Sequence, residues 1–169
     1  MSAAPNATPS PTVEAPQTAH ATFVVDRVYP HPASRVFFAL SDQASTRRWR
    51  VEGEGFEVFE HVFDFRVGGE ETSRFRFGDG PDMTTAAQYQ VIVPDRRIVF
   101  SYRMTFAGEP MSVCLVTVDL TPAPGGTRMT YTEQGVYFGD PDGPGGPANR
   151  EEGTRQLLES LAAELARAG

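Results

Sequence analysis

Residues 97–106 read RIVFSYRMTF, and this stretch decides the fold class because its side chains alternate in character. Successive side chains of a β-strand point to opposite faces of its sheet. One face here is apolar and aromatic, with Ile98, Phe100, Tyr102, Met104 and Phe106. The other face is largely polar, with Arg97, Ser101, Arg103 and Thr105. The pattern predicts a strand that covers a core on one side and faces water on the other.

Strands of the same kind are expected before and after residues 97–106. Pro94 and Asp95 make the turn that precedes this strand, and other Gly- and Pro-containing turns separate its neighbours. The neighbouring strands are expected at 22–29, 56–67, 70–77, 83–93, 111–121 and 127–137. Between residues 56 and 137 no helical pattern interrupts the strands, which predicts an antiparallel meander.

Three helices complete the expected order of elements. Pro32 suits the first turn of a helix over residues 32–40, and Asp42 is the expected cap of a second short helix that ends near Trp49. Asn149 is the expected cap of the last helix, with Glu152 at the capping-box position. An amphipathic repeat follows in Leu157, Leu158, Leu161, Ala162 and Leu165. We therefore predict an α+β fold of one strand, two helices, six strands and a final helix, with a curved antiparallel sheet wrapped around that long C-terminal helix.

Composition bounds the domain organisation and the class of partner. The chain has 169 residues, 40% of them hydrophobic, which suits one domain over residues 21–169. Residues 1–20 are rich in Pro, Ala, Ser and Thr and lack a signal-peptide pattern, so we expect a disordered tail and a cytoplasmic protein. A net charge of −7 argues against nucleic acid and against an anionic membrane as partners. A homodimer is kept as an open alternative.

The residue types exclude several kinds of chemistry. All fifteen Lys+Arg residues are Arg, so the chain has neither a Schiff-base lysine nor a P-loop lysine. His20, His31 and His61 lack the spacing of metal ligands, and the single cysteine, Cys114, is expected in the core. We expect no metal, no nucleotide and no other cofactor.

The apolar sheet face and the last helix are expected to enclose a cavity for a small molecule. Gly153 lies one turn before Leu157 on the same helix face, and its missing side chain makes space there. The Gly- and Pro-rich residues 139–148 would form a mobile rim. A solid core is the alternative, because aromatic residues on a strand usually fill one. The expected lining residues are Phe63, Phe75, Tyr89, Tyr102, Met104, Phe106, Tyr131, Glu133, Gly153 and Leu157.

Glu133 is the most informative polar residue on these faces. It alternates with Met129 and Tyr131, so it points inward if they do. A buried carboxylate is costly unless it is paired or hydrogen-bonded, and a ligand-filled pocket could use it. The alternative places Glu133 near the strand end, in water or bonded to the loop that follows.

Two further polar residues share faces with aromatic ones. His61 alternates with Phe59 and Phe63, but a bulge in the long 56–67 strand would reverse its direction. Glu71 follows a turn and is expected at the rim rather than in the pocket. We assign no catalytic role, and Glu133 and His61 are the two candidates for one.

Four stretches in this order resemble the START-like helix-grip superfamily (SRPBCC): VVDRVYPHPASRVFFALSD, FDFRVGGEE, VIVPDRRIVFSYRM and GGTRMTYTEQG. More narrowly, the chain is similar to the bacterial members grouped with activators of heat-shock-protein ATPase, from about Thr22 to Ala168. The resemblance implies a helix-grip fold with a hydrophobic cavity between the sheet and the C-terminal helix. Relatives in this superfamily bind lipids, steroids or plant hormones, or act as polyketide cyclases, and the resemblance implies a function of this kind. It carries no catalytic residue over to this chain.

Three functions follow as hypotheses. The first, which the residues favour, is binding of a small, largely hydrophobic molecule with one or two polar groups. The second is a cofactor-independent enzyme of the cyclase, dehydratase or hydrolase kind that uses Glu133 or His61 with a tyrosine such as Tyr102. The third is an interaction domain that activates a chaperone ATPase.

Overall fold

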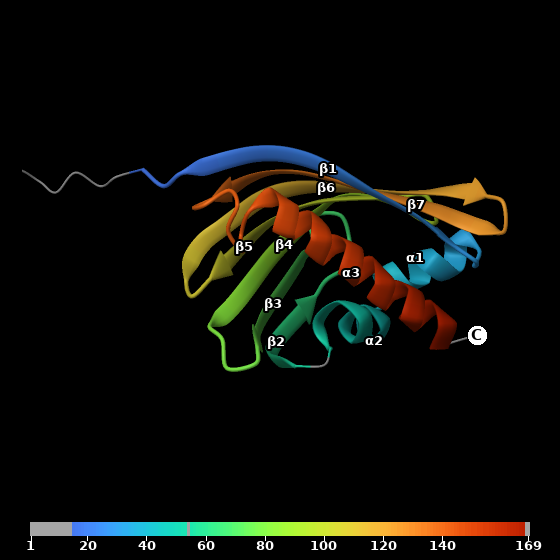
Figure 1. Ribbon diagram of the computed structural model, residues 1–169. Helices are drawn as coiled ribbons and strands as arrows, with labels where there is room; N and C mark the ends of the chain where they lie inside the picture. Colours follow the sequence, from blue (N-terminus) through green and yellow to red (C-terminus); the bar gives the residue numbers. More distant parts are fainter. Residues whose placement is uncertain (1–14, 54, 168–169) are drawn as a thin grey trace, which may run out of the picture.

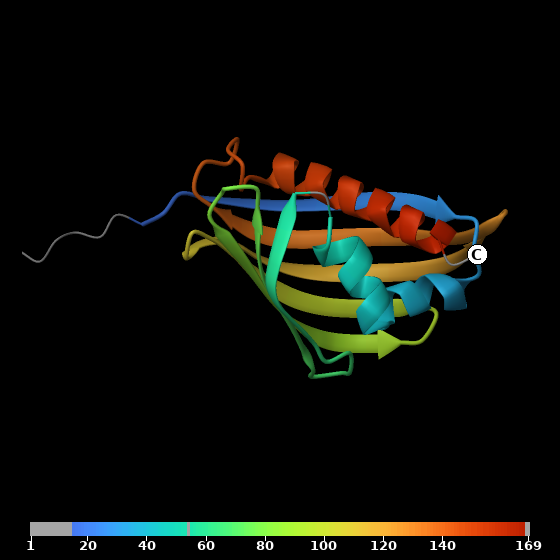
Figure 2. The same ribbon diagram turned by 90° about the horizontal axis from the view of Figure 1, so that it is seen from below.

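The structure of the chain, a computed structural model, describes residues 15–53 and 55–167. Its strands form one seven-stranded antiparallel sheet in the order β1-β7-β6-β5-β4-β3-β2. The sheet is strongly curved, and the long helix α3 lies along its concave side with α1 and α2 nearby (Figures 1 and 2). The strands are β1 (Thr18–Tyr29), β2 (Phe56–Phe63), β3 (Glu70–Phe77), β4 (Asp82–Val93), β5 (Arg97–Phe106), β6 (Glu109–Ala123) and β7 (Gly126–Phe138). The helices are α1 (Ala33–Ser41), α2 (Gln43–Thr46), the π-helical turn η1 (Arg47–Val51) and α3 (Pro147–Arg167).

This arrangement confirms the predicted α+β helix-grip fold. The order of strands and helices is the predicted one, and the strands expected at 70–77 and 97–106 coincide with β3 and β5. The alternation in residues 97–106 holds as far as Met104, since Ile98, Phe100 and Tyr102 are buried and Met104 packs against the core. Within the described ranges, no helix has the length and apolar character needed to cross a membrane.

The core lies between the sheet and α3. Leu158, Leu161 and Leu165 are the buried stripe of the helix, as their spacing predicts. Tyr29 ties β1 to this helix, because its hydroxyl donates to the Leu158 carbonyl at 3.1 Å. The buried residues that they meet from the sheet and from α1 include Val25, Val36, Val116, Val118, Leu120 and Met129.

Two elements, β1 and α3, begin earlier than predicted. Residues 18–20, predicted as part of a disordered tail, pair with residues 136–138 and so belong to β1. Residues 1–14 of the predicted tail lie outside the described residues. Helix α3 begins at Pro147, a first-turn position that does not need a backbone N–H. The Asn149 side chain therefore does not cap the helix, and it donates to the Gly143 carbonyl at 2.9 Å.

Two β-bulges change the predicted alternation. In β2 the register shifts between Val58 and Glu60, so Phe59 is exposed while the His61 side chain is buried. In β4 the register shifts between Tyr89 and Val91, so Val91 and the later Val93 are exposed although simple alternation places them with Tyr89. An extra residue in one strand reverses the faces of the residues beyond it. Strand β2 also ends at Phe63, short of the predicted residue 67.

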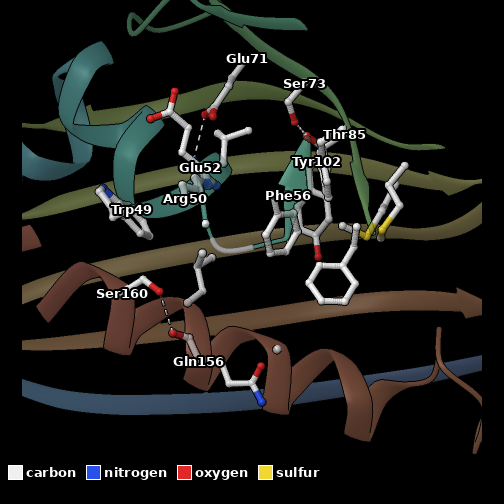
Figure 3. Close-up of a pocket in the computed structure, with 18 of the residues that line it drawn as sticks. Trp49, Arg50, Glu52, Phe56, Glu71, Ser73, Thr85, Tyr102, Gln156 and Ser160 are labelled. Atoms are coloured by element: carbon white, nitrogen blue, oxygen red, sulfur yellow. Dashed lines mark hydrogen bonds and ion pairs between the residues drawn. The ribbon is translucent and has the colours of Figure 1, made fainter. Parts of the chain in front are cut away.

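The chain between α2 and β2 differs from an ordinary helix end. Asp42 caps α2 as predicted, since its side chain accepts from the Ser45 N–H at 2.8 Å. The helical segment then continues past Trp49 as the π-helical turn η1 and ends at Val51. Such turns are rare and are often found at functional sites. From this one, Arg50 reaches the space between η1 and the sheet (Figure 3).

Candidate functional site

A cavity of about 460 Å³ opens between α3, η1 and the concave side of the sheet. Its volume falls within the range of small-molecule pockets, roughly 300–1,000 Å³. The labelled side chains of Figure 3 point into it from three directions: Gln156 and Ser160 from α3, Trp49 and Arg50 from η1, and Ser73, Thr85 and Tyr102 from the sheet. The sheet wall also contains Phe75, Ala87 and Met104.

The helical wall has space where Gly153 lies. A Cβ atom built on Gly153 would meet one heavy atom within 4 Å, Nη1 of Arg150 at 3.9 Å. Leu157 lines the same wall one turn later. Both residues therefore border the cavity on its helical side.

Aromatic rings form the outer rim of the cavity. Phe56 and Phe77 line it while remaining 44% and 59% exposed, a large apolar surface to leave in water. Their ring centroids lie 5.1 Å apart, and the Phe75 ring lies 5.8 Å from that of Phe56. A ligand that enters past these rings would bury surface that water now contacts.

Glu71 is buried beside the cavity and is held by three partners. Its Oε2 accepts from Arg50 Nη1 at 2.9 Å and from the Tyr89 hydroxyl at 2.6 Å. Its Oε1 lies 3.2 Å from Nε2 of His61. Burial opposes ionisation of this carboxyl group, but the charge of Arg50 and the bonds from His61 and Tyr89 outweigh it and lower its pKa. Glu71 is thus an ionised carboxylate inside the fold, and the prediction that it lies at the rim is wrong.

Glu133 is fully buried and accepts from three tyrosines. Its Oε1 accepts from Tyr102 at 2.8 Å and Tyr137 at 3.0 Å, and its Oε2 accepts from Tyr131 at 3.0 Å. Arg150 adds contacts of 3.3 Å and 3.4 Å to the two oxygens. Burial raises the pKa of Tyr131, and the neighbouring Glu133 raises it further. This phenol therefore stays protonated and donates. The inward direction of Glu133 is confirmed, and its partners are side chains of the fold.

Two arginines from different elements line the cavity. Arg50 comes from η1 and Arg150 from the first turns of α3, and both line the space. Burial lowers the pKa of Arg50, but the charge of Glu71 is the largest opposing effect, and the pKa lies above its usual value. The charge of Arg150 has a smaller, opposing effect on that pKa, which means that the two guanidinium groups repel each other.

Six of the ten predicted lining residues border this cavity: Phe75, Tyr102, Met104, Tyr131, Gly153 and Leu157. Tyr89 and Phe63 lie deeper in the aromatic packing, with ring centroids 6.3 Å apart, and Glu133 lies behind the tyrosines. Phe106 is a wrong prediction, because it does not border the cavity and is 45% exposed. The β5–β6 register shifts between Met104 and Thr105, and Phe106 then pairs with Glu109 where the hairpin leaves the concave side.

The residues that alternation does not reveal come from outside the strands. Trp49 and Arg50 lie on the π-helical turn, which no spacing rule for α-helices places. Arg150 was within reach of sequence reasoning, because it lies three residues before Gly153 and so shares its helix face. The described residues bring no three His, Cys, Asp or Glu side chains together as a metal site.

Comparisons with known proteins agree with this architecture. Residues 30–166 match the family described as Activator of Hsp90 ATPase homolog 1-like protein. The Mll3558 protein from Rhizobium loti is 55% identical, with 88% of this chain and 99% of that chain covered and a TM-score of 0.78. A putative uncharacterized protein from Rhizobium leguminosarum is 33% identical, with 91% and 99% covered and a TM-score of 0.84. An AHSA1-like protein from Aeromonas hydrophila, 18% identical over 88% of this chain and 94% of that chain, shares the fold with a TM-score of 0.67. No curated protein matches the chain.

Proposed function

This chain belongs to the family of Activator of Hsp90 ATPase homolog 1-like proteins, and we propose that it binds a small, largely hydrophobic molecule between the sheet and α3. The observation that carries the proposal is the open space opposite Gly153, in a cavity of about 460 Å³. Protein interiors are packed nearly as densely as organic crystals, so a gap of this size is not ordinary core. In this proposal the protein works in the cytoplasm, and its partner is the small molecule.

The lining supports a mostly apolar ligand. Phe56, Phe75 and Phe77 border the outer part of the cavity, and Met104 lies on the sheet wall. Aromatic rings and methionine adapt to apolar molecules of varied shape. Burial of apolar ligand surface against them contributes roughly 25 cal/mol per Å² before the costs of association are subtracted.

Replacement of Gly153 tests the proposal directly. Gly153→Leu would place a bulky side chain in the open space, whereas Gly153→Ala would change the helix propensity with little change of volume. We expect both variants to fold, and we expect the Leu variant to bind a neutral fluorescent probe such as Nile red at least tenfold more weakly than the Ala variant. Probe titration and thermal unfolding of the wild type and both variants make the measurement.

A solid core would give the opposite pair of results. The Leu variant would then overpack and lose roughly 1–3 kcal/mol of stability relative to the Ala variant. The wild type would bind no probe. That combination would contradict the proposal and leave a function on the surface of the domain.

Activation of a chaperone ATPase is the alternative that the family's description favours. It predicts that the chain stimulates ATP hydrolysis by Hsp90 and that Gly153→Leu leaves the stimulation intact. The enzymatic alternative gains less from the geometry, because every oxygen of Glu133 already accepts from tyrosines and Arg150. His61 likewise contacts Glu71 and does not border the cavity.

A further inference from the structure

The hydrogen-bonding groups around the cavity are unequally satisfied, and the surplus consists of donors. Arg50 has five N–H groups in its guanidinium. One of them, on Nη1, donates to Glu71 Oε2 at 2.9 Å, and the Tyr89 hydroxyl lies beside the same guanidinium group. Among the described residues, no further acceptor lies within hydrogen-bond distance of Arg50. Its side chain is 25% exposed, so these groups are only partly available to bulk water.

Arg150, on α3, shows the same surplus. Its Nε donates to the Tyr102 hydroxyl at 2.8 Å, and its Nε and Nη2 contact Glu133 at 3.3 Å and 3.4 Å. Its Nη1 has no acceptor within the described ranges and lies nearest to the open position at Gly153. The unpartnered nitrogens of Arg50 and Arg150 are not sealed inside the protein, because neither residue has a fully enclosed atom without a bond.

The carboxyl oxygens beside these arginines are already occupied. Both oxygens of Glu133 accept from tyrosines, and Oε2 of Glu71 accepts from Tyr89 as well as from Arg50. Glu52, which also lines the cavity, contacts Arg47 at 2.5 Å. A ligand therefore finds cationic donors to bond and few free carboxyl acceptors. Its polar end should be an acceptor without hydrogens of its own.

The positive charge of the two arginines also favours a ligand with a negatively charged acceptor. Arg50 and Arg150 both line the cavity, and a negative group that contacts the two guanidinium groups would be attracted to both. The planar guanidinium presents paired N–H groups whose spacing matches the two oxygens of a carboxylate. A carboxylate therefore fits the donors in number, in sign and in shape.

We propose that the ligand is an amphipathic carboxylic acid whose carboxylate is bound jointly by Arg50 from η1 and Arg150 from α3. Its apolar part then lies against Phe56, Phe75 and Met104, toward the exposed aromatic rim. This inference rests on the proposed function, since it specifies the ligand of the same cavity. In this orientation the head group lies inside the cavity and the apolar body lies toward its rim.

A matched pair of fluorescent probes separates the two claims. 1-Pyrenebutyrate and 1-pyrenebutanol have the same apolar body and differ in the carboxylate, and the methyl ester of the acid adds a neutral acceptor. We expect the wild type to bind the acid at least tenfold more tightly than the alcohol, which corresponds to about 1.4 kcal/mol. The ester should bind nearly as weakly as the alcohol. Fluorescence titration at neutral pH measures all three dissociation constants.

Paired substitutions then locate the preference without leaving a buried charge alone. Arg50→Gln with Glu71→Gln, and Arg150→Gln with Glu133→Gln, each remove both members of one ion pair. Each double variant should lose most of the preference for the acid and keep its affinity for the alcohol within about threefold. Arg155→Gln is the matched control, because Arg155 is an exposed arginine on α3 that pairs with Glu151 outside the cavity.

The outcomes distinguish the two proposals. Equal binding of acid and alcohol by the wild type overturns the carboxylate inference while the cavity still binds apolar molecules. A preference that survives in both double variants also overturns it, because the acid would then be bound elsewhere. Failure of the wild type to bind any of the three probes contradicts the proposed function as well. The comparison within the wild type needs no variant, so a misfolded variant does not weaken it.

Discussion

Two glycines on the inner side of the fold have opposite surroundings. A Cβ on Gly153 would meet open space, whereas a Cβ on Gly135 in β7 would lie 2.6 Å from Sγ of Cys114 and 3.2 Å from the Tyr137 ring. Cys114 is the direct cross-strand partner of Gly135. The missing side chain in β7 is therefore a packing requirement, and the missing one in α3 leaves a cavity.

The two glycines give a residue-scale prediction. Gly135→Ala should destabilise the protein by about 1–3 kcal/mol through overpacking. Gly153→Ala should stabilise it by up to about 1 kcal/mol, because alanine favours the helix. Chemical denaturation of both variants measures the difference. Cys114→Ala removes the contacting sulfur, so its combination with Gly135→Ala should cost less than the sum of the two single changes; strict additivity would show that Cys114 is not the obstacle.

The alternation of residues identifies the cavity wall only where a strand is regular. The alternation of β5 identifies Tyr102 and Met104 correctly, because nothing interrupts the strand before them. It fails at Phe106, since alternation indicates a face but does not indicate where the curved sheet leaves the helix. Arg50 could not be found this way, because its direction depends on a π-helical turn that has no spacing signature in the sequence.

At the scale of elements, the sequence does not indicate where the bulges lie or where the strands end. The apolar patterns predict every strand, but the extra residues at Phe59 and Gln90 resemble ordinary strand residues. The first residues of β1 are likewise hard to recognise in the sequence, because they are polar or alanine. Ala19 and Ala21 pack on the core without a large side chain. The register there depends on β7, which lies more than a hundred residues away in the chain.

The early start of β1 can be tested by two truncations. A chain that begins at Gln17 keeps all twelve residues of β1, whereas a chain that begins at Ala21 loses the pairing of residues 18–20 with β7. We expect the shorter chain to be less stable by roughly 1–3 kcal/mol, about 1 kcal/mol for each backbone hydrogen bond lost. Thermal or urea unfolding of both chains makes the comparison. Equal midpoints would mean that residues 18–20 contribute nothing to the folded state.

For the whole molecule, the fold follows from the sequence more readily than the cavity does. One apolar face per strand and one amphipathic helix at the end of the chain leave few arrangements other than a sheet that grips the helix. A filled core and a hollow one use the same aromatic residues, however, so the pattern does not distinguish them. The difference lies in how α3 packs against the sheet at Gly153, where an added Cβ would meet one heavy atom within 4 Å, Nη1 of Arg150.

A ligand in that cavity should connect parts of the molecule that are distant in sequence. It would contact η1, the first half of α3 and strands β3 to β5 at once, because these elements form its walls.

Binding to the folded state alone raises stability, by about 2.7 kcal/mol at a ligand concentration one hundred times Kd. We expect 1-pyrenebutyrate at that excess to raise the melting temperature. Hydrogen–deuterium exchange should slow mainly in residues 47–51 and 150–160, while the β1 residues that face away from α3 change little. Gly153→Leu should reduce both effects. Protection spread evenly over the chain, or concentrated on β1 and the outer face of the sheet, would place the ligand outside the cavity, because only contact with these walls couples the π-helical turn to the helix.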